Sequence, residues 1–182
     1  MLSWTRLRLH AGLSLRPWLS YSAARRIAEI LPPNAHALEI GSGQSTLWLA
    51  RRCERLLSIE ADKHWFDHLR GELARAGHHH VDLRYRWRAE EIADFSSVED
   101  SSLDFILVDG GPRAEVLERS YCKLRPGGVL YVDNTDNPGI SESCRADLIA
   151  HAARTGGKLE FFPDFSPGIL HATEGVLWIS PK

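Results

Sequence analysis

The sequence is poor in the features that mark several classes of protein. It has three cysteines and no Cys-x-x-Cys pair, which excludes a disulfide-stapled scaffold and a cysteine-based zinc site. No apolar run approaches the roughly 18 residues that a membrane-spanning helix needs. The formal net charge is −2, so the chain lacks the excess of positive charge that holds many proteins on nucleic acid. We therefore expect neither a membrane nor a nucleic acid as its partner.

Acidic residues are missing from the N-terminal end, where the first one is Glu29. The same stretch carries arginines at five positions: Arg6, Arg8, Arg16, Arg25 and Arg26. An acid-poor, arginine-rich start is typical of an organelle transit peptide. The alternative, which we prefer, is that residues 17–33 run straight into a structural helix and that the protein is cytoplasmic.

The remaining composition is that of an ordinary globular protein, with 43% hydrophobic and 25% charged residues. A chain of 182 residues is long enough to bury a full core. It contains no internal repeat, low-complexity tract or linker. We therefore predict one domain over 1–182, made of an N-terminal helical segment (1–34) and a cofactor-binding core (35–182).

Helical and strand patterns alternate along the core. Short apolar runs predict strands over 36–40, 55–60, 81–87, 103–109 and 129–133. Amphipathic stretches between them predict helices, and two final strands (158–162 and 175–180) follow each other without a helix, as in an antiparallel hairpin. This alternation predicts an α/β fold, a doubly wound, mostly parallel sheet with helices on both faces.

Acidic residues end most of the predicted strands. Glu39, Glu60, Asp109 and Asp133 each stand at or near a strand's carboxyl end. In doubly wound sheets, ligands bind in the crevice outside these ends. We therefore expect the functional site to lie there and to be lined by carboxylates.

Two glycines follow the first predicted strand in the stretch 37–50, ALEIGSGQSTLWLA. Gly41 and Gly43 lie between a strand and a helix, where a missing side chain lets a ligand touch the backbone. Glu60 ends the next strand, about 20 residues later, where a carboxylate reaches the ribose hydroxyls of a nucleoside. The alternative is a tight turn without a ligand, but the combination favours a nucleoside.

The residues around this loop distinguish two nucleoside ligands. Nicotinamide dinucleotides prefer a third glycine, and Thr46 stands in its place. Glu39, just before the loop, would repel a pyrophosphate but suits a cationic ligand. S-adenosylmethionine carries a sulfonium and an ammonium group and no phosphate, so the chemistry favours it. An NAD(P)-dependent oxidoreductase stays open as the alternative.

Four stretches resemble the successive motifs of class I S-adenosylmethionine-dependent methyltransferases: LEIGSGQSTLWLARR, LLSIEADKHWFDHL, DFILVDGGPRAEV and LRPGGVLYVDNTD. The flanking PWLSYSAARRIAEIL and FSPGILHATEGVLW resemble a small branch of that superfamily with poorly defined substrates. The resemblance covers nearly the whole chain. It implies a Rossmann-like sheet of strand order 3-2-1-4-5-7-6, with strand 7 antiparallel.

The resemblance also implies the cofactor contacts. The methionine moiety would lie against Glu39, Gly41, Ser42 and Gly43, and Glu60 would hold the ribose. Ala61 and Asp62 would flank the adenine, Ala89 and Glu90 would lie near its edge, and Asp109 would also contact the cofactor. It places Trp18 near the cofactor mouth, although an aromatic contact that closes the sheet explains it equally well. One departure is Ser45, which stands where the fuller family motif has a further glycine.

A second cluster combines Asp109, Asp133 and Asn134. Neighbouring strand ends would bring their oxygen atoms together, and oxygen ligands suit a hard cation such as Mg²⁺. The arrangement resembles the metal site of catechol-type O-methyltransferases, where the metal lowers the pKa of the acceptor hydroxyl. The alternative is that Asp109 only positions the cofactor while Asp133 and Asn134 form a turn.

Arg113 stands near the position where that catechol-type family carries a lysine that acts as the base. Arginine stays protonated and cannot take a proton. It could clamp a carboxylate or phosphate of the substrate, or it could be a surface residue at a helix start.

These observations predict a methyltransferase that moves a methyl group from S-adenosylmethionine to a small molecule, with oxygen as the expected acceptor atom. Asp109, Asp133 and Arg113 are the candidate catalytic residues. A non-catalytic S-adenosylmethionine-binding protein is a further alternative. No insertion is large enough for a substrate lid, so acceptor recognition is expected from the N-terminal segment, the loop after Asn134, or a second subunit of a homodimer.

Overall fold

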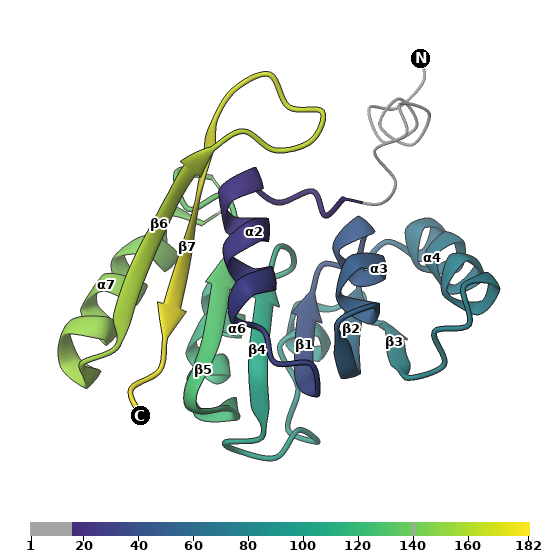
Figure 1. The fold of residues 1–182 in the computed structure, drawn as a ribbon, viewed down its shortest axis with the longest axis horizontal. Coiled ribbons are helices and arrows are strands. Elements are labelled where there is room, and N and C mark those ends of the chain that lie inside the picture. Colours follow the sequence, from purple (N-terminus) through teal and green to yellow (C-terminus); the bar gives the residue numbers. More distant parts are fainter. Residues whose placement is uncertain (1–15, 140) are drawn as a thin grey trace.

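The computed structural model describes residues 16–139 and 141–182, so Arg6 and Arg8 of the arginine-rich start lie outside the described residues. Seven strands form one sheet in the order β3-β2-β1-β4-β5-β7-β6 (Figure 1). All neighbours are parallel except β7, which is antiparallel to both β5 and β6. The predicted fold class and strand order are confirmed.

The elements follow the predicted alternation. The strands are β1 (Ala35–Ile40), β2 (Cys53–Glu60), β3 (Val81–Tyr85), β4 (Leu103–Val108), β5 (Leu124–Val132), β6 (Lys158–Asp164) and β7 (Thr173–Ile179). The helices are α2 (Tyr21–Ile30), α3 (Gln44–Ala50), α4 (Lys63–Arg75), α5 (Ala89–Ile92), α6 (Arg113–Ser120), the 3₁₀ turn η1 (Tyr121–Lys123) and α7 (Glu142–Thr155).

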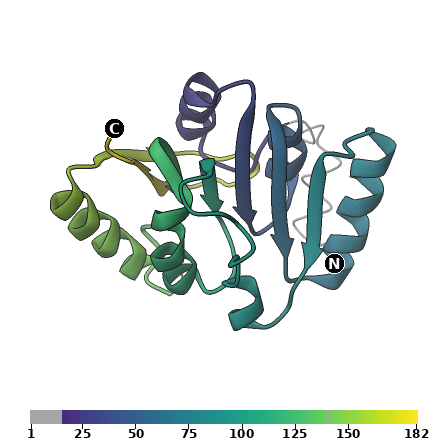
Figure 2. The same cartoon turned by 90° about the horizontal axis from the view of Figure 1, so that it is seen from below.

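Helices cover both faces of the sheet (Figure 2). Phe105 and Leu107 of β4 face the cluster that includes α2 and α3, whereas Ile106 and Val108 face the cluster that includes α5, α6 and α7. Successive side chains of a strand point to opposite faces, so a central strand with two covered faces must be apolar throughout. This explains the unbroken apolar run of β4 from Phe105 to Val108, which follows Asp104 near the start of the strand. Helix α4 packs beside α3 and over β2 and β3.

The sequence pattern and the structure differ most around Leu124. The helical spacing of Leu117, Tyr121 and Leu124 favours one helix followed by a Pro-Gly-Gly turn, but α6 ends at Ser120 and Leu124 begins β5. The Pro-Gly-Gly stretch lies in a bulge within β5, because Leu103 of β4 pairs with Leu124 while Phe105 pairs with Val129. Local periodicity detects neither change, since both depend on pairing with β4.

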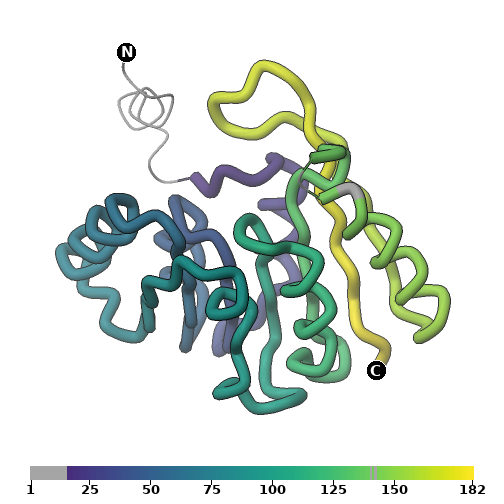
Figure 3. The backbone as a smooth tube through the Cα atoms, turned by 180° about the vertical axis from the view of Figure 1, so that it is seen from behind, coloured from purple at the N-terminus to yellow at the C-terminus, as the bar shows by residue number. Residues whose placement is uncertain are grey.

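Two segments far apart in the sequence lie at the same end of the sheet, above the carboxyl ends of the parallel strands (Figures 1 and 3). They are residues 16–20 and the connection between β6 and β7. The backbone N–H of Tyr21 donates to the carbonyl of Phe165 at 3.0 Å, and the N–H of Ser22 donates to Asp164 Oδ2 at 2.9 Å. Among the described helices, none combines the length and apolar character needed to cross a membrane.

Candidate functional site

A cavity of about 670 Å³ opens at the carboxyl ends of β1, β2 and β4. Its wall includes three acidic residues, Glu60, Asp62 and Asp109, together with Trp18 and Trp65. Of the described residues that line it, none is a lysine or an arginine. The crevice predicted from the acidic strand ends is therefore present.

Position 41 must be a glycine because the backbone at the end of β4 lies against it. Its φ is +90°, and a Cβ built on it would lie 2.8 Å from the carbonyl carbon of Asp109 and from the backbone nitrogen of Gly110. Gly43 is different, because its φ is −177° and the nearest atom to an added Cβ, Trp65 Nε1, is 3.8 Å away. The sequence predicts that a ligand lies close to the backbone at both glycines. At Gly41, the atoms that come close are those of the protein's own backbone at Asp109 and Gly110.

A buried hydrogen-bond chain holds the glycine loop. The N–H of Gly43 donates to Thr46 Oγ1 (2.8 Å), and that hydroxyl donates to Glu39 Oε2 (2.5 Å). The Ser58 hydroxyl donates to the same oxygen (2.6 Å) and lies 2.6 Å from the hydroxyl of Ser42. Thr46, which replaces the third glycine of a dinucleotide motif, therefore fixes the loop.

Glu39 is fully buried beneath the loop and does not line the cavity. Burial raises its pKa to about 7, although the hydroxyls of Ser58 and Thr46 favour the charged form. The resemblance implied that Glu39 contacts a methionine moiety. That contact stays a prediction, and the hydrogen bonds that Glu39 accepts come from Thr46 of α3 and Ser58 of β2.

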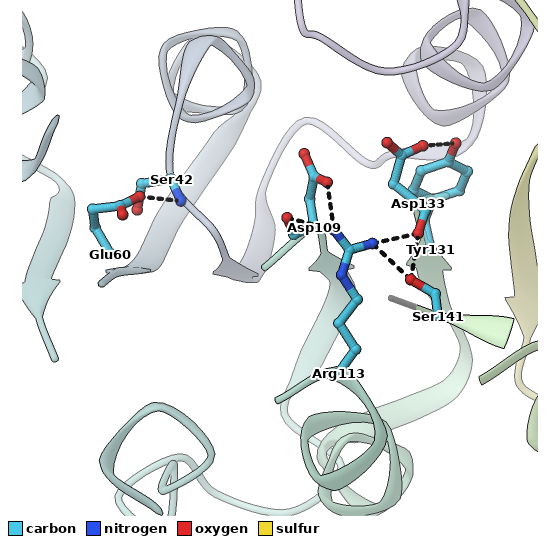
Figure 4. A network of polar contacts seen from close by, with 7 residues as sticks. All are labelled: Ser42, Glu60, Asp109, Arg113, Tyr131, Asp133 and Ser141. Atoms are coloured by element: carbon cyan, nitrogen blue, oxygen red, sulfur yellow. Dashed lines mark hydrogen bonds and ion pairs between the residues drawn. The ribbon is translucent and has the colours of Figure 1, made fainter. Parts of the chain in front are cut away.

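Glu60 lines the cavity and is already hydrogen-bonded to the backbone. Its Oε1 accepts from the N–H groups of Ala61 (2.8 Å) and Asp62 (2.7 Å), and Oε2 accepts from that of Ser42 (3.0 Å) (Figure 4). Burial raises its pKa and outweighs these three bonds. A carboxylate offers about four acceptor positions, so one remains for a ligand hydroxyl.

An aromatic wall closes the cavity beside this loop. The indole N–H of Trp65 donates to the carbonyl of Ser42 at 2.9 Å. Trp65 stacks on Trp18 with ring centroids 5.9 Å apart and lies 5.1 Å from the ring of His68. His64 also lines the cavity. The helical spacing of Trp65, Leu69 and Leu73 predicts a core face, so the sequence does not mark Trp65 as a site residue, although its place in the first turn after Asp62 puts it at the crevice.

Neither of the two residues that the resemblance implies near the adenine edge lines the cavity. Ala89 and Glu90 lie on α5, are exposed and do not line the cavity. Ile92 of the same helix does line it, and a Cβ on Gly111 would lie 2.7 Å from Ile92 Cγ2. The apolar contact on this side comes from Ile92, which the motif comparison did not single out.

The second cluster is organised by Arg113, whose side chain is 7% exposed. Its Nη2 donates to the carbonyl of Asp109 at 2.8 Å and to Asp109 Oδ1 at 3.1 Å (Figure 4). Its Nη1 donates to the carbonyl of Asp133 and, at 3.0 Å, to Ser141 Oγ. Arg113 is therefore not the surface residue that one interpretation of the sequence suggested.

Asp109 and Asp133 lie on the same side of the Arg113 guanidinium (Figure 4). The buried hydroxyl of Tyr131 donates to Asp133 Oδ1 at 2.9 Å. Tyr131 fits because β7 has a glycine beside it, where a Cβ on Gly175 would lie 1.9 Å from the Tyr131 oxygen. Burial raises the pKa of Asp133 to about 6, and burial beside Asp133 raises that of Asp109 well above its usual range.

These residues do not fit a divalent cation as they lie. The guanidinium of Arg113, which is always positively charged, donates to Asp109 Oδ1 and to the backbone carbonyls of Asp109 and Asp133. Asp133 Oδ1 already accepts a hydrogen bond from the Tyr131 hydroxyl. Asn134 has a φ of +54°, and its carbonyl accepts from the N–H of Asn137 at 3.0 Å, as in the predicted alternative of a turn. Within residues 16–139 and 141–182, no group of three or more His, Cys, Asp or Glu side chains is placed to hold a metal.

Comparison with known structures shows the same fold in proteins of low sequence identity. The chain resembles an O-methyltransferase from Bacillus cereus in complex with SAH, with a TM-score of 0.72, 21% identity, and coverage of 99% of this chain and 91% of the other. It also resembles the O-methyltransferase TomG from Streptomyces achromogenes, involved in tomaymycin synthesis and solved in complex with SAM (TM-score 0.66, 22% identity, coverage of 98% of this chain and 79% of the other). An rRNA methylase from Streptococcus thermophilus matches as well (TM-score 0.71, 13% identity, coverage of 89% of this chain and 96% of the other).

In sequence, no curated protein matches the chain significantly. Residues 38–135, more than half of the chain, match the methyltransferase domain family. The matched range contains the glycine loop, Glu60, Asp109, Arg113 and Asp133. The chain therefore belongs to the methyltransferase domain family, within the class I S-adenosylmethionine-dependent methyltransferase superfamily.

Proposed function

We propose that this protein binds S-adenosylmethionine in the cavity at the ends of β1, β2 and β4 and transfers its methyl group to an oxygen atom of a small molecule. The observation that carries this proposal is the charge of the cavity wall. Glu60, Asp62 and Asp109 line it, and no lysine or arginine among the described residues does so. Such a wall suits a ligand with a sulfonium and an ammonium group, whereas the pyrophosphate of NAD(P) would meet three acids and, among the described lining residues, no lysine or arginine.

The donor supplies a methyl group on a positively charged sulfur, which is open to in-line displacement. The protein's contribution is to hold donor and acceptor aligned and to exclude water. Glu60 offers its remaining acceptor position to a ribose hydroxyl, and Ile92 offers an apolar contact to the adenine. Gly41 and Ser42 face the methionine end, and the tryptophan wall covers it.

The acceptor side is proposed to lie between Asp109 and Asp133. Asp109 lines the cavity with a side chain that is 26% exposed, and Asp133 lies one strand further along the sheet. A carboxylate with a raised pKa is a better proton acceptor than an ordinary one. Either residue, when ionised, can take the proton of an acceptor hydroxyl, and Asp109 is the one that lines the cavity. In this proposal Arg113 holds the two strand ends in place and does not clamp the substrate, because both of its terminal nitrogens, Nη1 and Nη2, already have internal partners.

The choice of oxygen and of a small acceptor is supported by the two O-methyltransferases of the same fold. Because an rRNA methylase shares the fold, RNA is included among the acceptors to be tested, although the formal net charge of −2 disfavours RNA binding. A homodimer, a cytoplasmic location and a single domain over 1–182 remain predictions. Sedimentation of the purified full chain would test the first.

Methyl transfer can be tested with S-adenosylmethionine labelled in the methyl group. Purified protein is incubated with the labelled donor and sets of small hydroxyl, amine and carbon acceptors, with an RNA mixture in a parallel reaction. The proposal expects label in a small hydroxyl compound. Label in RNA would overturn the small-molecule acceptor, and donor binding without transfer to any acceptor would favour the non-catalytic alternative.

A further inference from the structure

Three oxygen atoms at the ends of β4 and β5 share one guanidinium. Arg113 Nη2 donates to the backbone oxygen (2.8 Å) and Oδ1 (3.1 Å) of Asp109, and Nη1 donates to the backbone oxygen of Asp133. We propose that the Arg113 guanidinium takes the place of a divalent cation between Asp109 and Asp133, so that this site works without a metal ion. The inference rests on the proposed function only in treating these strand ends as the acceptor side.

The position of the guanidinium is fixed from two directions. Arg113 is the first residue of α6, so its backbone is held by the helix that packs on β4. At the other end, Ser141 Oγ accepts from Nη1 at 3.0 Å and lies 3.2 Å from the carbonyl oxygen of Asp133, to which its hydroxyl donates. An arginine presents its donors in a rigid planar fork, which matches several fixed acceptors at once. The side chain is 7% exposed, so water does not replace these bonds easily.

The charges at the site argue against a second cation beside Arg113. The guanidinium is always protonated, and a divalent ion at the same two aspartates would be held within a few ångströms of it, where like charges repel strongly in a partly buried site. With Arg113 in place, the two aspartates leave at most one uncompensated negative charge. Asp109, which lines the cavity, can direct that charge at a monovalent cationic ligand such as a sulfonium.

Manganese binding tests the proposal without any acceptor. Mn²⁺ is titrated into the full-length protein, and free ion is measured by electron paramagnetic resonance, with and without S-adenosylhomocysteine. The wild type is expected to bind no stoichiometric Mn²⁺. Arg113→Met removes the charge but keeps an unbranched side chain, so it should gain one Mn²⁺ site per chain. Adding Asp133→Asn to that variant should abolish the new site.

Arg119→Met is the matched control. Arg119 lies on the same helix, and its Nη1 donates to the carbonyl of Ala93 at 3.1 Å, away from the two strand ends. Its loss should leave Mn²⁺ binding unchanged. Circular dichroism checks that each variant folds. If Arg113→Met does not fold, Arg113→Lys keeps the positive charge and should still exclude Mn²⁺.

Two results would overturn the proposal. One is a wild-type protein that binds one Mn²⁺ per chain and loses it in Asp109→Asn. The other is a folded Arg113→Met variant that gains no Mn²⁺, since Arg113 would then not be what keeps the ion out. A failure of the proposed function is distinguishable, because it would appear as absent binding of S-adenosylmethionine while the Mn²⁺ results stand.

Discussion

Gly41 and Gly110 touch through their backbones across the ends of β1 and β4. A Cβ on Gly41 would lie 2.8 Å from the nitrogen of Gly110, and a Cβ on Gly110 would lie 2.8 Å from the Cα of Gly41. Neither residue can carry a side chain without a backbone shift. The floor of the cavity is therefore set by contact between two strand ends, and the ligand space lies above that contact.

Replacing Gly41 should reduce stability. In Gly41→Ala, the left-handed φ of +90° and the 2.8 Å contact both oppose the new methyl group. We expect the free energy of unfolding to fall by on the order of 2–4 kcal/mol. Gly43→Ala is the control, because its φ is −177° and its nearest contact would be 3.8 Å. Urea unfolding of the two variants checks this, and equal shifts of their midpoints would contradict it.

Removing the carboxylate of Glu60 should weaken both the fold and ligand binding. Glu60→Ala takes away the acceptor of three backbone N–H groups, those of Ser42, Ala61 and Asp62. Each charge-assisted bond is worth about 1.5–3 kcal/mol, so we expect a lower unfolding midpoint and S-adenosylmethionine binding weaker by about a hundredfold. Glu60→Gln keeps one acceptor oxygen and should lose less of both.

Calorimetry for affinity and urea unfolding for stability separate the two effects of Glu60. The matched control is Asp62→Asn, which changes an acid of the same cavity wall whose side chain, among the described residues, accepts one backbone N–H, that of Trp65 at 2.8 Å. Unchanged affinity in Glu60→Ala would mean that the ribose is held elsewhere.

Glu39 should give the protein a stability that depends on pH. Burial raises its pKa to about 7, above the value of about 4.3 expected in the unfolded chain. Between these values the folded state binds the proton that the unfolded chain has lost. The free energy of unfolding therefore decreases as pH rises through this window, and the contribution is complete only below it.

Glu39→Gln removes that contribution while keeping an acceptor oxygen for Thr46 and Ser58. Between about pH 5 and pH 7, the free energy of unfolding should fall less in the variant than in the wild type. The difference between the two falls should be up to ~3 kcal/mol. Asp133 and Asp109 also have raised pKa values, so the comparison uses the difference between the two proteins. Parallel curves of stability against pH would show that Glu39 is ionised normally.

The sheet could be predicted from the sequence because its signals are local. β4 is buried at every position and, apart from Asp104, apolar, since both faces are covered, and the predicted strands lead to acids at the ends of β2, β4 and β5. The strand order came from the family resemblance and is confirmed by the pairing. The bulge at Pro126–Gly128 was not predictable, because its register is set by β4.

The site was predicted in composition more than in arrangement. Glu60, Asp109 and the glycine loop meet at the cavity as expected. The sequence alone did not decide whether Arg113 clamps a substrate or lies on the surface. Its partner Ser141 is 28 residues away in the sequence and reaches it only after the chain folds back from β5. Helical periodicity predicted a core position for Trp65, because the same spacing of apolar residues occurs on a core face and on a cavity wall.

Calorimetric titration of the purified full-length protein with S-adenosylmethionine and, separately, with NAD⁺ and NADP⁺ tests the central claim most directly. We expect one S-adenosylmethionine per chain, with binding weakened in Glu60→Ala, and no heat of binding from either dinucleotide, because the cavity wall carries three acids and, among its described residues, no lysine or arginine. Binding of NAD⁺ or NADP⁺ at one per chain, with no heat from S-adenosylmethionine, would contradict the account.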